Sequence, residues 1–193
     1  MQNAVKIGKE TIPAKCRPYV THVVIPDSIT SIGEETFYDC SGLTSIVIPD
    51  SVTNIGDCAF ENCSGLTSIA IPNSVTSIGE DVFYNCISLI SVVIPESVTC
   101  IGDGAFTECP NLISIIIPDS VKNIGSWAFG YCTNLTSIVI PDSVKSIGSG
   151  AFKYCESLKN IVFKGKTLKK VKHMKHYPWG ADTSKTEIIA EFE

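Results

Sequence analysis

Long apolar runs are absent from this sequence of 193 residues. A membrane-spanning helix needs about 18–20 consecutive apolar residues, and no segment approaches that length. Residues 1–6 also lack the apolar stretch of a signal peptide. We therefore expect a soluble chain without a membrane span, whose compartment the sequence leaves open.

Positive charge is scarce in the body of the chain. Residues 20–152 contain fourteen Asp and Glu residues against two lysines, Lys122 and Lys145, whereas residues 153–176 contain eight lysines and one Glu. An acidic surface repels the phosphate backbone of nucleic acids. We expect no nucleic-acid partner along the body, and a basic C-terminal end.

Motifs that carry catalysis or bind cofactors are missing as well. The sequence has no Cys-x-x-Cys, no Gly-x-Ser-x-Gly and no Gly-x-x-x-x-Gly-Lys. His173 and His176 are three residues apart and could share a helix face, but no Cys or acidic residue stands beside them to complete a metal site. The sequence therefore predicts no enzyme activity, no cofactor and no metal.

The sequence has, instead, a strict period of 23 residues. An Ile-Pro pair, a glycine and a phenylalanine each recur six times at this spacing: Pro26, Pro49, Pro72, Pro95, Pro118 and Pro141; Gly33, Gly56, Gly79, Gly102, Gly125 and Gly148; Phe37, Phe60, Phe83, Phe106, Phe129 and Phe152. A fixed period of this size is typical of a solenoid, in which each repeat is one coil stacked on the next.

The start of each coil reads as a short strand. Residues 44–48 are rich in β-branched side chains and end at Pro49, which cannot donate to a sheet ladder. Equivalent strands of successive coils are expected to pair in parallel into one continuous sheet of about seven strands.

The remainder of the coil is expected to turn back across the core. Gly56 is predicted to take the backbone through a positive φ, and residues 59–63 have the spacing of a helical turn. Eight positions of this coil are expected to point into one shared apolar column: Val52, Ile55, Ala59, Phe60, Cys63, Leu66, Ile69 and Ile71. Stacking of the coils buries this column.

Six of the nine cysteines keep the repeat register, and Cys16, Cys58 and Cys100 lie outside it. The register positions are Cys40, Cys63, Cys86, Cys109, Cys132 and Cys155. Side chains stacked in parallel point the same way rather than at each other, and an odd count makes a poor disulfide framework. We interpret the repeat cysteines as free thiols that pack as small hydrophobes.

These repeats resemble the BspA-like leucine-rich repeat family. Residues 43–48 read Leu-x-x-Ile-x-Ile and residues 59–69 read Ala-Phe-x-x-Cys-x-x-Leu-x-x-Ile, a pattern that recurs in six copies between residues 20 and 163. The Asn of the common leucine-rich repeat is replaced by Ser51 and its equivalents. The resemblance implies a β-rich α/β solenoid: a right-handed coil with a continuous parallel β-sheet on one face and short helical turns on the other.

The resemblance also implies adhesion. Proteins similar to this one are often found on bacterial or protozoan surfaces, where some bind host matrix proteins or cells, which implies a secreted or cell-surface location. No catalytic residue belongs to the family, so none is carried over.

Strand alternation places two columns on the outer face of the sheet. One column is apolar: Val24, Val47, Ala70, Val93, Ile116, Val139 and Val162. The other is mainly serine: His22, Ser45, Ser68, Ser91, Ser114, Ser137 and Asn160. Apolar stripes often mark interaction sites, although β-branched residues also occur there because they favour strands.

We predict that the middle of this face binds a flat or repetitive protein or glycan partner. The predicted partner-binding residues are Val47, Ser68, Ala70, Ser91, Val93, Ser114, Ile116, Ser137 and Val139.

A third column follows the prolines: Asp27, Asp50, Asn73, Glu96, Asp119 and Asp142. Stacked carboxylates could collect cations, but the glycine- and aspartate-rich nonapeptide of calcium solenoids is absent. The favoured interpretation is that these side chains cap turn N–H groups and keep the protein soluble.

Two flanking segments differ from the repeats, which gives three predicted parts. Residues 1–19 form an N-terminal cap, residues 20–163 form the solenoid of six full repeats, and residues 164–193 form a basic C-terminal cap. Within the last, Thr167 is expected to cap a helix that Pro178 ends, and Trp179 and Ile188-Ile189 are expected to fold back as a closing segment or edge strand.

The C-terminal helix is expected to pack Leu168, Val171 and Met174 on the last coil, with its lysines facing water. A basic amphipathic stretch is also typical of contact with a membrane surface or an anionic partner. It could equally attract the acidic flank of another copy and give weak self-association.

Two functions follow. The first is a non-enzymatic binding or adhesion module whose sheet face holds a protein or glycan partner, such as a host surface or extracellular matrix. The alternative is a structural spacer with contacts through its capped ends.

Overall fold

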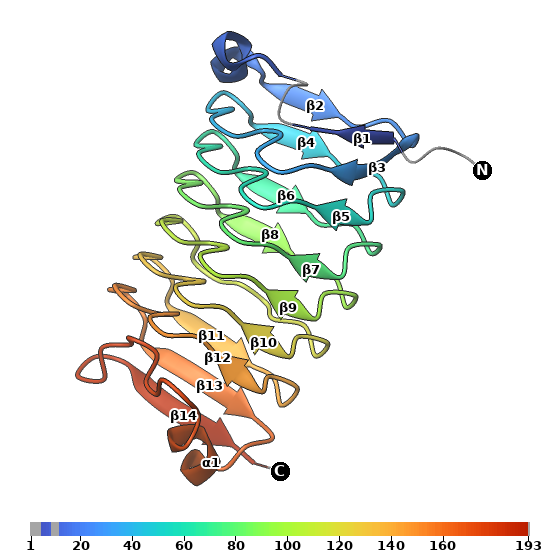
Figure 1. The fold of residues 1–193 in the computed structure, drawn as a ribbon. Coiled ribbons are helices and arrows are strands. Elements are labelled where there is room, and N and C mark those ends of the chain that lie inside the picture. The colour runs from blue at the N-terminus through green and yellow to red at the C-terminus, as the bar shows by residue number, and fades with distance from the viewer. Residues whose placement is uncertain (1–4, 9–11, 193) are drawn as a thin grey trace.

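The computed structural model describes residues 5–8 and 12–192. The chain winds into coils stacked along one axis, with β2 at one end and β14 and α1 at the other (Figure 1). Two ladders of short parallel strands run along this axis. The predicted β-rich solenoid with parallel sheet is confirmed, and the structure contains very little helix.

The first ladder forms the surface that we call the sheet face. It contains β2 (His22–Val24), β4 (Ser45–Val47), β6 (Ser68–Ala70), β8 (Ser91–Val93), β11 (Ser137–Ile140), β13 (Asn160–Lys164) and β14 (Glu187–Glu191). Pairing within it is parallel and steps by one repeat, as in Ser68 opposite Ser91.

The sheet face is divided into segments. Within the described residues, β2 pairs with β4, β6 pairs with β8, and β11, β13 and β14 form a third group, which Ile116 joins through a bridge to Val139. The face is parallel throughout, as expected, but its hydrogen-bonded pairing is not unbroken.

The second ladder lies on the adjacent side of the coils. It contains β1 (Val5–Ile7), β3 (Ile29–Ile32), β5 (Asn54–Ile55), β7 (Ser77–Ile78), β9 (Cys100–Ile101), β10 (Asn123–Ile124) and β12 (Ser146–Ile147). Five of these strands have two residues, which is too short for a pattern of alternating residues in the sequence to predict them.

The predicted helical turns are wrong. Glu61 N–H donates to the Cys58 carbonyl at 3.1 Å, which closes a β-turn, while Phe60 N–H donates to Val82 of the next coil at 2.9 Å. Cys58 and Asn62 have φ of 54° and 60°. Alternate amides therefore leave the coil to bond its neighbour, whereas an α-helix would use them internally.

The prediction of a positive φ at Gly56 is also wrong, because that conformation occurs at Cys58 instead. Glycine is needed at 56 for another reason: a Cβ there would lie 2.5 Å from Glu34 N and 2.7 Å from Gly33 C of the preceding coil. Successive backbones approach too closely at this point for any side chain.

The core is the predicted apolar column. All eight expected positions of the coil from Val52 to Ile71 are buried. The phenylalanines form a continuous stack in which neighbouring ring centroids are 5.2–5.9 Å apart and the rings are almost parallel. Each coil thus completes the core of the next.

The N-terminal end of the column is covered by the 3₁₀ helix η2 (Ala14–Tyr19). Arg17 of η2 is buried, and its guanidinium donates to the carbonyls of Ile12 at 3.1 Å and Tyr38 at 2.8 Å. This side chain fixes η2 against the first coil.

The C-terminal end is covered by α1 (Leu168–Lys172) and by Trp179. The Thr167 side chain accepts from Lys170 N–H, as expected for an N-cap. Val171 and Trp179 are fully buried, whereas Leu168 is exposed, so the expected packing of Leu168 is wrong. The helix has only five residues and ends at Lys172, so it is too short to carry all three of the side chains that were expected to pack on the last coil.

Trp179 folds back and closes the last coil, as expected. Its carbonyl accepts from Phe152 N–H at 3.0 Å, and its ring lies 5.3 Å from that of Phe163. β14 then pairs with β13 as the last strand of the sheet face.

Candidate functional site

The predicted partner-binding residues lie together on the sheet face. The valines, isoleucine, alanine and serines of the prediction are all exposed; Val93 and Ile116 keep 63% and 84% of their surface accessible. Parallel pairing sets Ala70 beside Val93 and Ile116 beside Val139. The structure thus brings the two columns into one continuous surface.

Two further isoleucines on this face were missed. Ile90 and Ile113, 52% and 53% exposed, precede the strands at the position where Thr44 and Thr136 stand in other coils. Comparison of the repeats with one another would have shown them, because they break the consensus only in two adjacent coils. We call Ile90, Val93, Ile113 and Ile116 the central patch.

The outward columns of the sheet face around the central patch carry no charged side chain. From residue 44 to residue 139, the apolar column, the serine column and the column that contains Thr44 and Ile90 consist of serine, threonine, alanine, valine and isoleucine alone. Such a surface loses water at little cost, because no charged group has to be stripped of its hydration.

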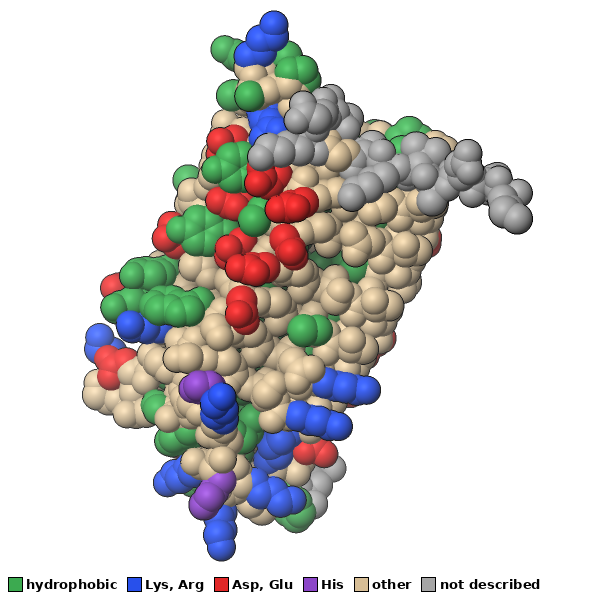
Figure 2. Space-filling model, viewed as in Figure 1, with side chains coloured by type: hydrophobic (Ala, Val, Ile, Leu, Met, Phe, Trp, Pro, Cys, Tyr) green, Lys and Arg blue, Asp and Glu red, His purple; other side chains and the backbone are tan. Residues whose placement is uncertain are grey.

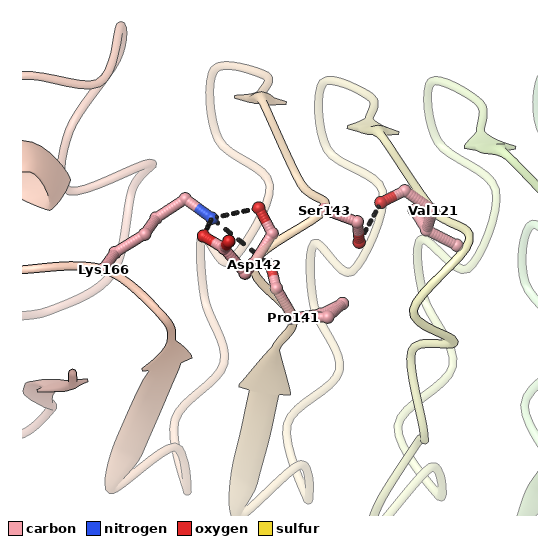
Figure 3. Close-up of polar contacts among 5 residues, drawn as sticks. All are labelled: Val121, Pro141, Asp142, Ser143 and Lys166. Atoms are coloured by element: carbon pink, nitrogen blue, oxygen red, sulfur yellow. Dashed lines mark hydrogen bonds and ion pairs between the residues drawn. The ribbon is translucent and has the colours of Figure 1, made fainter. Parts of the chain in front are cut away.

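The third column, which consists of Asp27 and its equivalents, does not cap the turns as predicted. Among the described residues, no turn N–H donates to these side chains; the turns close through the proline carbonyl, as from Val52 N–H to Pro49 at 3.0 Å. The carboxylates are exposed, and from Ser51 to Ser143 the serine that follows each position of the column donates to a carbonyl of the preceding coil instead. Ser143 Oγ, for example, donates to the Val121 carbonyl of the preceding coil at 2.7 Å (Figure 3).

Lys166 ends this serine ladder. It occupies the repeat position of serine, and its Nζ donates to the Asp142 carbonyl at 2.6 Å and pairs with Asp142 Oδ1 at 3.1 Å (Figure 3). The long side chain therefore reaches back and closes the last turn.

The repeat cysteines are buried free thiols, as expected, and they also have a hydrogen-bonding role that the sequence did not reveal. Cys86 Sγ donates to the Phe60 carbonyl at 3.2 Å, and the equivalent contact recurs in the other coils. Burial raises the pKa of Cys155 to about 12 and that of Cys40 to about 11. These thiols stay protonated and unreactive at neutral pH.

The described residues contain no group of three or more His, Cys, Asp and Glu side chains placed to hold a metal ion. His173 and His176 are exposed, and His173 Nδ1 lies 2.7 Å from the Lys169 carbonyl. Within the same residues, no helix has the length and apolar character needed to cross a membrane.

Comparison with known families now places this architecture. The model of the BspA type leucine rich repeat region matches in six copies, over residues 7–136 and 62–177. The chain belongs to this family. A search of curated proteins finds no match.

Solved members of the leucine-rich repeat class share the fold. The chain is 30% identical to a leucine rich repeat protein of T. pallidum, with a TM-score of 0.70, over 88% of this chain and 86% of that one. It is also similar to the pneumococcal vaccine antigen PcpA, with a TM-score of 0.66 and 19% identity, over 90% of this chain and 42% of that one. The second likeness concerns the fold alone.

Proposed function

We propose that this BspA-type repeat protein is a non-enzymatic binding module whose sheet face holds a protein or glycan partner at an extracellular surface or matrix. The observation that carries the proposal is the central patch. Four large aliphatic side chains are exposed together in two adjacent coils. Two of them, Ile90 and Ile113, stand where other coils have a threonine, such as Thr44. Exposed apolar patches of this kind are typical of interaction sites.

The shape of the face favours an extended or flat partner. Its outward side chains are short, and parallel pairing holds them in register within each group of strands. The repeat fold itself offers ladders of like residues rather than a closed catalytic cleft.

The test is binding to immobilised matrix proteins and glycans by biolayer interferometry. The double variant Val93→Glu/Ile116→Glu places two carboxylates in the patch. We expect at least a tenfold loss of affinity, because a charge buried at an interface without a partner costs several kcal/mol. Circular dichroism should show an unchanged fold.

Val24→Glu is the matched control. Val24 belongs to the same column and is exposed on β2, but it lies outside the central patch. Binding that survives the double variant, or that Val24→Glu weakens equally, contradicts the assignment to the central patch.

We propose a structural spacer as the second candidate, with residues 1–19 and 164–193 as caps that carry the contacts. The observation that favours it is the exposure of Leu168 and Phe192 at the C-terminal end. Leu168→Glu/Phe192→Glu should then reduce assembly in sedimentation experiments, while the central-patch variant leaves it unchanged. Point variants are preferable to deletion, because Val171 and Trp179 support the last coil.

A further inference from the structure

A pocket of about 370 Å³ opens on the turn face, the surface formed by residues 33–40 and their equivalents in each coil. It is lined on one side by acidic residues and on the other by Trp127 and Tyr131. Figure 2 shows the acidic side chains gathered over the upper part of the molecule, with hydrophobic side chains beside and below them.

The pocket exists because one repeat position changes from coil to coil. The column reads Glu35, Cys58, Asp81, Gly104, Trp127 and Gly150. Gly104 has a φ of 63° and no side chain, so the space above it lies between Asp81 of one coil and Trp127 of the other. A Cβ at Gly104 would overlap the Asp81 carboxylate, which shows how closely that group covers the glycine.

The acidic wall has no opposite charge from its own coils. Glu80, Asp81, Asp103 and Glu108 line the pocket, while residues 20–121 contain neither Lys nor Arg. Burial, followed by the neighbouring carboxylates, raises the pKa of Asp81. Glu108 is held in place by Tyr84, whose hydroxyl donates to it at 2.9 Å.

The aromatic wall already carries a cation on its other side. Lys153 Nζ lies 4.9 Å from the ring centroids of both Trp127 and Tyr154. Gly150 packs under the Trp127 ring on that same, C-terminal side, where a Cβ would lie 3.0 Å from Cε2. The side of Trp127 towards Gly104 is the one that lines the pocket.

We propose that this pocket binds a Lys or Arg side chain of a basic peptide partner. An ammonium or guanidinium group between the two walls pairs with the carboxylates and stacks on the indole, so both walls act on the same ligand. A divalent metal ion would use the carboxylates and gain little from the ring. The site is separate from the sheet face, so it stands or falls independently of the function proposed above.

The experiment is calorimetric titration with an eight-residue Gly-Ser peptide that carries three lysines, its arginine counterpart, and a glutamine counterpart of equal length. We expect saturable binding of the two basic peptides and none of the glutamine peptide. Trp127→Leu should weaken binding about tenfold without changing any charge. Asp81→Asn/Glu108→Gln should weaken it at least as much.

Asp50→Asn/Glu96→Gln is the control, because it removes two exposed carboxylates of the same types that do not line the pocket. If this control weakens binding equally, or if Trp127→Leu has no effect, the attraction is only that of an acidic surface and the proposal fails. It also fails if Ca²⁺ competes as effectively as the peptide. Sedimentation in the absence of peptide must give a monomer, since self-association that depends on Asp81 would identify a second copy as the occupant instead.

Discussion

Substitution of Gly102 by alanine tests how the coils are stacked. An added Cβ would lie 2.5 Å from Gly79 C and 2.9 Å from the Ile78 carbonyl oxygen, both in the preceding backbone. Ordinary contact begins near 3.4 Å, so the two coils have to separate locally. The Gly102 N–H bond to the Ile78 carbonyl, 2.8 Å long, spans the same gap and would lengthen.

The magnitude follows from these two effects. Overpacking costs about 1–3 kcal/mol, and a weakened inter-coil hydrogen bond adds about 1 kcal/mol. Reduced freedom of the unfolded chain returns about 0.4–1 kcal/mol. We therefore expect Gly102→Ala to lower the free energy of unfolding by about 1–3.5 kcal/mol, which corresponds to a fall in Tm of about 2–14 °C.

The assay is urea and thermal unfolding followed by circular dichroism, with Gly8→Ala as the matched control. A Cβ at Gly8 meets nothing within 4 Å, so this variant should stay within about 1 kcal/mol of the parent. Equal stability of the two alanine variants would refute the close approach of successive backbones.

Three other predictions follow from the core and the turn face. Cys86→Ala should destabilise the fold by about 1–3 kcal/mol in urea titrations, because the Phe60 carbonyl keeps only the Cys63 N–H of its two donors and a small cavity opens in the core, while Cys86→Ser should retain most of the stability. Thiol labelling at pH 8 should modify exposed Cys16 rapidly and the buried repeat cysteines slowly, with nine thiols accessible after denaturation; rapid labelling of Cys109 would contradict its burial. Burial is the chief cause that raises the pKa values of Glu61 and Asp81, so ionisation of either carboxyl lowers the free energy of unfolding. This loss of stability is absent below the ordinary carboxyl pKa, grows as pH rises from that value to the raised pKa, and is complete above it. Glu61→Gln/Asp81→Asn should accordingly raise Tm at pH 7 more than at pH 4, and an equal effect at both pH values would oppose this explanation.

The period was sufficient to predict the stacked core, because a residue such as Phe60 that recurs every 23 positions has to meet its own copies. The turns were not predictable from spacing alone. Ala59, Phe60 and Cys63 fit one face of a helix, and they fit equally well a pair of β-turns whose amides bond the next coil. Only the hydrogen bonds between coils, which the structure shows, distinguish the helix from the β-turns.

At the ends of the chain and in the candidate sites, too, local features were predictable, whereas contacts between distant residues were not. The N-cap at Thr167 is local chemistry and was predictable, and Trp179 was expected in a closing segment, but no local pattern encodes its contact with Phe152. The exposed valine column followed from strand alternation, and Ile90 was recoverable from repeat comparison. The pocket at Gly104 depends on three different coils standing in register, so it required the structure.

The central claim is that like residues of consecutive coils lie directly over one another and so align the surface columns. Nuclear Overhauser effects between the aromatic protons of Phe60 and Phe83 test it most directly, because their ring centroids are 5.5 Å apart. The account predicts cross-peaks between these rings, and between Phe83 and Phe106 in turn. Rings that show no such cross-peaks in the folded protein, while contacting other parts of the chain, would contradict the stacking and every surface assignment built on it.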